Sequence, residues 1–141
     1  MSLCAFDTNI LAYAAGVGHS MSDKPKAALA AALIAEIVAT DPFVVPVQVC
    51  LELHQMLVRK RGLKRSEAAA TVDELVAGAM LIASDQTVLA EAFKLAVRHQ
   101  LQTYDAVILA AAARAGCDIL YSEDMQHGFE WSGVQVINPF A

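Results

Sequence analysis

The chain has 141 residues, 57% of them hydrophobic and 18% charged, and its formal net charge is −5. This composition excludes a disordered protein and allows one domain, residues 1–141, with a full-sized hydrophobic core. The acidic balance argues against a protein that holds nucleic acid by bulk positive charge alone.

Apolar runs, helix caps and turn residues predict short strands that alternate with helices. Pro25 suits the first turn of one helix, whereas Gly62 and Gly116 lie where two other helices end. In chain order, the sequence predicts strand 3–6, helix 10–15, loop 16–23, helix 24–39, strand 43–45, helix 47–60, helix 66–78, strand 80–83, a helix from about residue 85 to about residue 100, helix 104–115, strand 118–122 and strand 134–137.

Strands that alternate with helices imply crossover connections between parallel strands. We therefore expect an α/β fold, in which a central, mostly parallel five-stranded sheet is flanked by helices. In sheets of this kind, ligands bind beyond the carboxyl ends of the strands. Polar side chains at those ends are therefore the first candidates for a functional site.

Four acidic residues lie at the edges of different apolar segments: Asp7, Glu52, Asp105 and Asp124. Asp7 and Asp124 come just after the first and fourth predicted strands. Glu52 lies about two turns into the helix after the second strand, and Asp105 lies in the first turn of the helix before the fourth. All four can therefore face one crevice, where carboxylates repel each other unless they hold a hard divalent cation.

Each acid also has an ordinary structural explanation. Asp7 and Asp105 can cap or complement the start of a helix. Glu52 has apolar helical neighbours and can form a salt bridge with Arg or Lys. Asp124 can be a loop acid, and so can Glu123 beside it; only one of these two is expected to face the site. The four explanations hold less well jointly than singly, so we favour a shared carboxylate cluster.

The segments around these acids resemble the four acidic motifs of the PIN-domain family, and specifically those of its VapC-type toxin ribonucleases. The matching segments are FDTNILAYA, QVCLEL, TYDAVILAAAA and YSEDM, and the resemblance extends to the closing VINPF. The family's acids map to Asp7, Glu52, Asp105 and Asp124, and its polar helper residues map to Thr8, Asn9 and Ser122. Ser122 stands where Thr is commoner in the family, and it keeps the hydroxyl group.

The resemblance implies a single PIN domain that acts as a Mg²⁺- or Mn²⁺-dependent endoribonuclease, the toxin of a toxin–antitoxin pair. Asp7 and Asp105 would be the central metal ligands. Glu52 would bind the metal directly or through water, and Asp124 would complete a second site. Asn9 is expected to orient Asp7. Hard oxygen ligands suit these cations, and the lack of paired Cys or His residues argues against zinc.

The expected partners are an RNA substrate, a small antitoxin that places a basic side chain among the acids, and a second copy of the chain. The homodimer is expected because helices 24–39 and 66–78 are rich in Ala and Leu. The widely spaced Cys4, Cys50 and Cys117 indicate no disulfide framework, so a cytoplasmic location is expected. The sequence shows no signal peptide and no apolar run of transmembrane length, so no membrane partner is expected.

The role of one basic segment and the function of the whole chain each have an alternative interpretation. The basic segment 59–65 (RKRGLKR) is either a solvated turn or a phosphate-contacting rim beside the crevice. The main functional alternative is a non-cleaving PIN-like module that binds RNA or a partner. A haloacid-dehalogenase phosphatase, whose DxD opening is similar to FDTN, is a poorer match because Asn9 stands where the second Asp is needed. None of the four histidines pairs at ligand spacing, so none is assigned a catalytic role.

Overall fold

The computed structural model describes residues 2–17 and 23–141, and this part of the chain forms six strands and six helices. Their order is β1 (Cys4–Phe6), α1 (Thr8–Ala14), α2 (Lys24–Thr40), β2 (Phe43–Pro46), α3 (Val47–Arg61), α4 (Arg65–Leu75), β3 (Met80–Ile82), α5 (Gln86–His99), α6 (Thr103–Arg114), β4 (Ile119–Tyr121), β5 (Glu130–Trp131) and β6 (Val134–Ile137). All the expected strands and helices are present, and the expected loop 16–23 lies largely outside the described residues. No described helix is long and apolar enough to cross a membrane.

The strands form one sheet in the order β3-β2-β1-β4-β6-β5. Every neighbouring pair is parallel except β5 and β6, which are antiparallel. The expected α/β fold with a mostly parallel sheet is therefore confirmed, with one strand more than the five expected. The additional strand, β5, has two residues, too few to show an alternating pattern. Ser132 and Gly133 have φ values of 50° and 85°, which close the two-residue hairpin between β5 and β6.

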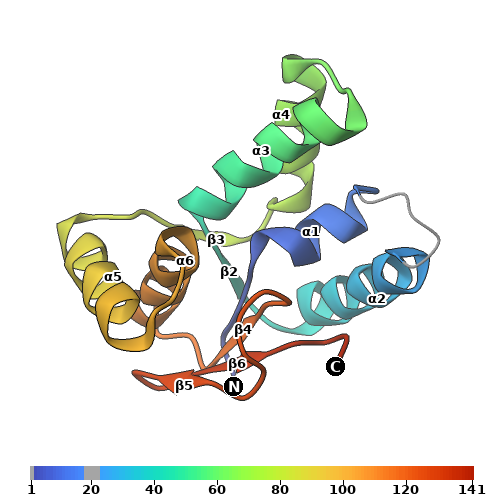
Figure 1. Ribbon diagram of the computed structural model, residues 1–141. Helices are drawn as coiled ribbons and strands as arrows, with labels where there is room; N and C mark the ends of the chain where they lie inside the picture. The colour runs from blue at the N-terminus through green and yellow to red at the C-terminus, as the bar shows by residue number, and fades with distance from the viewer. Residues whose placement is uncertain (1, 18–22) are drawn as a thin grey trace.

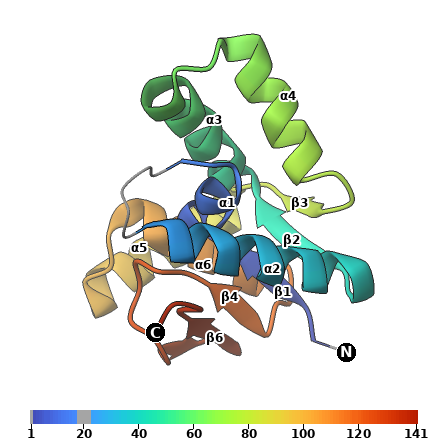
Figure 2. The ribbon, with the colours of Figure 1, turned by 90° about the vertical axis from the view of Figure 1, so that its right-hand side faces the viewer.

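Helices cover both faces of the sheet (Figure 1, Figure 2). α2 lies on one side, and α5 and α6 lie on the other, while α1 packs against α2 and α3. The central strands β1 and β2 are buried along their whole length, as parallel strands are when both faces are covered. Phe6 of β1, Leu120 of β4 and Leu109 of α6 are fully buried in this core. β1 and β4 are parallel neighbours in the sheet, so their carboxyl ends lie next to each other.

α3 and α4 form a helical hairpin that projects beyond the carboxyl ends of the strands (Figure 1). α3 ends at Gly62, whose φ of 72° gives the left-handed backbone that ends many helices. The last turn of α3 carries Arg59, Lys60 and Arg61. Nη1 of Arg61 donates a hydrogen bond to the carbonyl oxygen of Ala15 at 3.0 Å, which ties the hairpin to the end of α1.

Candidate functional site

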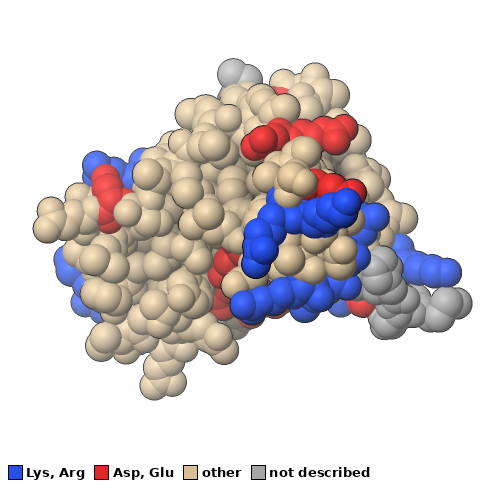
Figure 3. Space-filling model, turned by 90° about the horizontal axis from the view of Figure 1, so that it is seen from above, with Lys and Arg blue, Asp and Glu red and all other residues tan. Residues whose placement is uncertain are grey.

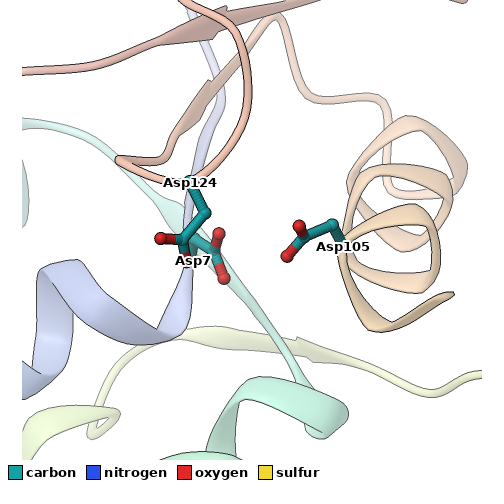
Figure 4. Close-up of side chains that lie close together, drawn as sticks. All are labelled: Asp7, Asp105 and Asp124. Carbon is teal, nitrogen blue, oxygen red and sulfur yellow. The ribbon is translucent and has the colours of Figure 1, made fainter. Parts of the chain in front are cut away.

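Three carboxylates meet at the carboxyl ends of β1 and β4. Asp7 directly follows β1, Asp124 lies in the loop after β4, and Asp105 points toward them from the first turn of α6 (Figure 4). One carboxylate oxygen from each residue lies within 4.8 Å of the other two. Because β1 and β4 are neighbours in the sheet, acids from opposite ends of the chain converge at this point.

Asp7 both caps α1 and belongs to this group of acids. It is 2% exposed, and its Oδ1 accepts a hydrogen bond from the backbone N–H of Thr8 at 2.6 Å. Its Oδ2 accepts a second hydrogen bond from the hydroxyl of Ser122 at 2.7 Å. The same Ser122 oxygen accepts the backbone N–H of Asp124 at 3.2 Å, so one buried hydroxyl links two of the carboxylate-bearing segments. The helix-cap explanation and the cluster explanation are therefore both correct for Asp7.

Burial and mutual repulsion raise the pKa values of the Asp7 and Asp105 carboxyl groups. The pKa of Asp7 is raised to about 7, mainly by burial. The hydrogen bonds that Asp7 accepts oppose this rise, and the negative charges of Asp105 and Asp124 add to it. Burial, followed by the charges of Asp124 and Glu52, raises the pKa of Asp105 to about 6. Each of these groups therefore favours a bound proton or a nearby cation over an isolated negative charge.

Glu52 lines the same pocket as the three aspartates without joining their closest group. The pocket has a volume of about 260 Å³, and its walls include all four acids. The hydroxyl of Thr8 donates a hydrogen bond to Oε2 of Glu52 at 2.6 Å. Within residues 2–17 and 23–141, the three salt bridges join Lys26 to Glu123, Lys94 to Glu91, and Arg114 to Asp85. The structure therefore shows Glu52 held by a neutral donor instead of a basic side chain.

Asn9 holds Asp124 instead of the expected Asp7. Its Nδ2 lies 3.1 Å and 2.9 Å from the two carboxylate oxygens of Asp124. Asp7 instead accepts its side-chain hydrogen bond from Ser122, which lies in the loop after β4. Each of these two acids is therefore held by a polar residue from the other acid's segment. Burial and the charge of Glu123 raise the pKa of Asp124, while the Asn9 amide opposes the rise.

A second acid of the same loop, Glu123, is bound in a separate network. The hydroxyl of Tyr13 donates to Oε2 of Glu123 at 2.7 Å, and Lys26 forms a salt bridge with Oε1. The Lys26 ammonium lies 5.6 Å from the ring centres of both Tyr13 and Phe140. Sequence reasoning missed Lys26 and Tyr13, because these residues lie about a hundred positions from Glu123 and carry no local motif. The expectation that only one of the two adjacent acids faces the site agrees with this geometry.

Two further hollows adjoin the acidic pocket. One, of about 440 Å³, shares Glu52 and Gln55 with it and is also lined by Arg59, Arg65 and Tyr104. The other, of about 510 Å³, shares Asp105 and Asp124 with it and is also lined by Gln100, Gln102 and Gln126. Seen from the carboxyl-end side, Lys and Arg gather over the α3–α4 hairpin, and acidic atoms lie in the hollow beside it (Figure 3).

The ligand atoms of the three clustered aspartates suit a hard divalent cation. All are carboxylate oxygens, the ligands that Mg²⁺ and Mn²⁺ prefer. The group found among the described residues contains neither Cys nor His, which zinc sites commonly use. Hydrogen bonds from Thr8, Asn9 and Ser122 fix the carboxylates without neutralising them.

Comparison with known proteins gives a family match and a set of similar folds. A family model described as "PIN domain" matches residues 4–128. No curated protein matches the sequence significantly. Three solved structures illustrate the fold similarity, each sharing 20% sequence identity or less with the chain.

VapBC-1 from nontypeable Haemophilus influenzae is 17% identical, with a TM-score of 0.66 over 99% of each chain. VapC20 from Mycobacterium tuberculosis, described as a sarcin-ricin loop cleaving toxin, is 20% identical, with a TM-score of 0.62 over 86% of this chain and 89% of that chain. VapBC2 from Rickettsia felis, bound to a DNA fragment from its promoter, is 14% identical, with a TM-score of 0.62 over 86% of this chain and 88% of that chain. At these identities, the similarity establishes the fold.

Proposed function

We propose that this chain, which belongs to the PIN-domain family, is a metal-dependent endoribonuclease and the toxin of a toxin–antitoxin pair. The observation that carries the proposal is that the acids of the pocket have neutral hydrogen-bond partners, whereas a neighbouring acid has a basic one. The hydrogen bonds to Asp7, Glu52 and Asp124 within the described residues come from neutral donors, whereas Glu123 beside them is paired with a lysine. Carboxylates that converge without a basic partner suit an external cation.

When bound, Mg²⁺ or Mn²⁺ activates water as a nucleophile and stabilises the negative charge that develops on the phosphate oxygens. We assign the central ligand positions to Asp7 and Asp105, which are the two more buried of the three clustered aspartates. Asp124 adds a third carboxylate, and Glu52 binds directly or through water. One carboxylate oxygen from each of Asp7, Asp105 and Asp124 lies within 4.8 Å of the other two, close enough for the three to share one ion.

Three neutral residues hold these ligands in place. Thr8 contacts both Asp7, through its backbone N–H, and Glu52, through its hydroxyl. Asn9 fixes both oxygens of Asp124, and Ser122 fixes Asp7. Such supporting hydrogen bonds orient metal ligands and typically change metal affinity or activity by about 10–100-fold when removed.

The proposed partners follow from the same cluster and from its structural neighbours. The VapBC structures from H. influenzae and R. felis support a small antitoxin as a partner. An antitoxin arginine placed among the acids would bind their carboxylates bidentately and replace the metal's charge. We also propose that residues 1–141 form one domain that acts in the cytoplasm.

We also propose a homodimer, and we extend its candidate contact surface beyond the two helices expected from the sequence. Leu29 and Val38 are exposed on α2, one of the two helices expected to form the contact. On α5, Leu89, Phe93 and Val97 are also exposed and recur every four residues, so they form one apolar stripe. We therefore add α5 to the candidate dimer surfaces.

Cleavage assays with and without metal test the proposal. The purified chain is incubated with unstructured and structured RNA in Mg²⁺, Mn²⁺ or EDTA. We expect cleavage of single-stranded RNA in either metal, none in EDTA, and none by Asp105→Asn. Asp73→Asn, the same change at an exposed acid of α4, is the matched control and should cleave like the parent. Cleavage that persists in EDTA would contradict the mechanism, and metal-independent RNA binding without cleavage would favour the non-cleaving module.

A further inference from the structure

The hollows on the two sides of the acidic pocket differ in charge. The hollow between α3 and the start of α6 has two arginines in its wall, Arg59 and Arg65. The hollow on the opposite side has three glutamines and no basic residue among its described lining residues. Of these two described hollows, the one between α3 and α6 therefore offers cations to a polyanion that crosses the acidic pocket.

We propose that the hollow lined by Tyr104, Arg59 and Arg65, here called the Tyr104 pocket, binds one unpaired nucleotide of RNA next to the phosphate that is cleaved. This inference rests on the proposed function and adds to it the form of the substrate and the side from which it is held. Tyr104 stacks on the base, and the two arginines contact the flanking phosphates.

The position of the pocket places a nucleotide next to the acids. The Tyr104 pocket shares Glu52 and Gln55 with the acidic pocket, so the two hollows lie next to each other. Tyr104 directly precedes Asp105 on α6, so the aromatic ring and the carboxylate belong to the same helical turn. The pocket volume of about 440 Å³ falls within the range of about 300–1,000 Å³ typical of small-molecule sites.

Tyr104 has the exposure of a stacking residue. The residue is 61% exposed, and none of the ring contacts found in the described part of the chain involves it. Leu51, which is 62% exposed, adds apolar surface to the same pocket. An exposed aromatic ring with apolar surface beside it and cations at the rim is the combination that single-stranded nucleic-acid sites use.

The polar side chains of the pocket suit a base and its phosphates. Gln48 and Gln55 from α3 offer both amide donors and carbonyl acceptors, which match the edges of an unpaired base. His54 lies with Nε2 3.1 Å from the carbonyl oxygen of Arg65, which ties the start of α4 to α3. That contact fixes the backbone of Arg65 at the rim. A base held in a stack within a duplex cannot enter such a pocket, so the pocket selects single strands.

Binding of a short RNA, measured separately from cleavage, tests the pocket. The probe is a fluorescently labelled eight-nucleotide single-stranded RNA in EDTA, followed by anisotropy at several salt concentrations. We expect Tyr104→Ala to weaken binding by about tenfold and Tyr104→Phe to bind like the parent, because the ring and not the hydroxyl stacks. With an RNA that lacks one base at the position facing the pocket, Tyr104→Ala and the parent should bind equally.

The arginines are tested by the salt dependence of the same binding. Each phosphate contact to single-stranded RNA contributes about 0.7 to the slope of log affinity against log salt. Arg59→Gln and Arg65→Gln should therefore each reduce the slope by about 0.7. Arg98→Gln, the same change at an exposed position of α5, is the control and should leave the slope unchanged.

The outcomes separate this inference from the proposed function. Parent-like binding and slopes in all pocket variants, with cleavage still dependent on metal, would overturn the nucleotide pocket and leave the nuclease intact. Parent-like RNA binding together with weaker retention of a co-purified protein partner by Tyr104→Ala would assign the pocket to a protein segment and also overturn it. Binding that shows the expected losses supports the pocket even if cleavage proves not to require metal.

Discussion

Glu123 and Asp124 are neighbours in one loop, yet the structure treats their charges in opposite ways. Glu123 is bound by the ammonium group of Lys26 and the hydroxyl of Tyr13. Asp124 is bound by the neutral amide of Asn9 and lies in the group formed with Asp7 and Asp105. The first arrangement neutralises a carboxylate within the fold. The second holds a carboxylate in place and leaves its negative charge available to a cation that the chain does not supply.

The same contrast extends over the molecule. Asp85 caps α5 and forms a salt bridge with Arg114, so its charge contributes to the fold. The clustered carboxylates are instead expected to destabilise the metal-free fold by burial and mutual repulsion, as functional sites often do. Under the proposed function, the paired acids have structural roles, and the clustered acids have the metal-binding role.

The strongest test of the comparison removes one negative charge from each of the two neighbours. We expect Asp124→Asn to lower the cleavage rate by more than about 100-fold, beyond the usual range for a supporting contact. Glu123→Gln should retain most of the activity, because its carboxylate belongs to the Lys26 network. Initial cleavage rates at saturating Mg²⁺ measure both. Equal losses in the two variants would mean that the contrast in partners has no functional meaning.

Loss of a neutral donor should have the next largest effect. Ser122→Ala removes the hydroxyl that holds Asp7, and we expect about a 10–100-fold loss of activity. Ser122→Thr keeps the hydroxyl and should restore most of that activity. Mg²⁺ titrations of the cleavage rate should show a weaker apparent affinity in the alanine variant. An alanine variant with the parent's Mg²⁺ dependence would show that this hydrogen bond does not support a metal ligand.

The pH dependence of stability sharpens the comparison. The pKa of Asp7 is raised from 3.8 to about 7 and that of Asp105 from 3.8 to about 6, so the folded state binds these protons more tightly than the unfolded state does. In EDTA, stability should therefore be greatest below about pH 4 for these groups and should fall as the pH rises to about 7. A tenfold change in proton affinity is worth about 1.4 kcal/mol, so the two groups together should cost several kcal/mol of stability over this pH range.

Denaturant unfolding between pH 4 and pH 8 measures this trend, with Asp7→Asn as the comparison. The variant has no titrating group at position 7, so its stability should fall less over the same range. Metal binding should show the opposite trend and strengthen as the pH rises, because the carboxylates must lose their protons to bind a cation. A parent whose metal-free stability rises steadily from pH 4 to pH 7 would contradict the burial of repelling acids.

The smallest expected effect concerns the Glu123 network itself. Lys26→Met removes the cation and should lower the free energy of unfolding by on the order of 1 kcal/mol, because the salt bridge is only partly buried. The effect on metal binding should be minor. Urea unfolding and Mg²⁺ titration of the same variant check both statements. A large loss of Mg²⁺ affinity with unchanged stability would place Lys26 in the functional site.

Much of the fold could be predicted from sequence because it depends on local signals. Alternating apolar runs and helix caps gave the order of strands and helices, and parallel connections followed from it. The hairpin strand β5 escaped prediction because two residues show no periodicity, and the positive φ of Ser132 is unusual for a residue other than glycine.

The sequence indicated which acids come together at the candidate site, but not which hydrogen-bond donor holds each acid. Asp7, Glu52, Asp105 and Asp124 each lie at a recognisable end of an element, and the structure brings all four to one pocket. Which donor holds which acid depends on side-chain geometry across the sheet. Asn9 therefore contacts Asp124 instead of Asp7, a result that no spacing in the sequence indicates.

Thermal unfolding of the parent and of Asp105→Asn, each in EDTA and in Mg²⁺, tests most directly whether these acids form a cation site. We expect the variant in EDTA to be as stable as the parent or more stable, with a gain on the order of 1 kcal/mol, because one repelling charge is removed. Mg²⁺ should stabilise the parent more than the variant, since a ligand stabilises the state that binds it. If the variant is less stable and responds to Mg²⁺ as the parent does, then Asp105 only complements the start of α6, and the carboxylates do not form a metal site.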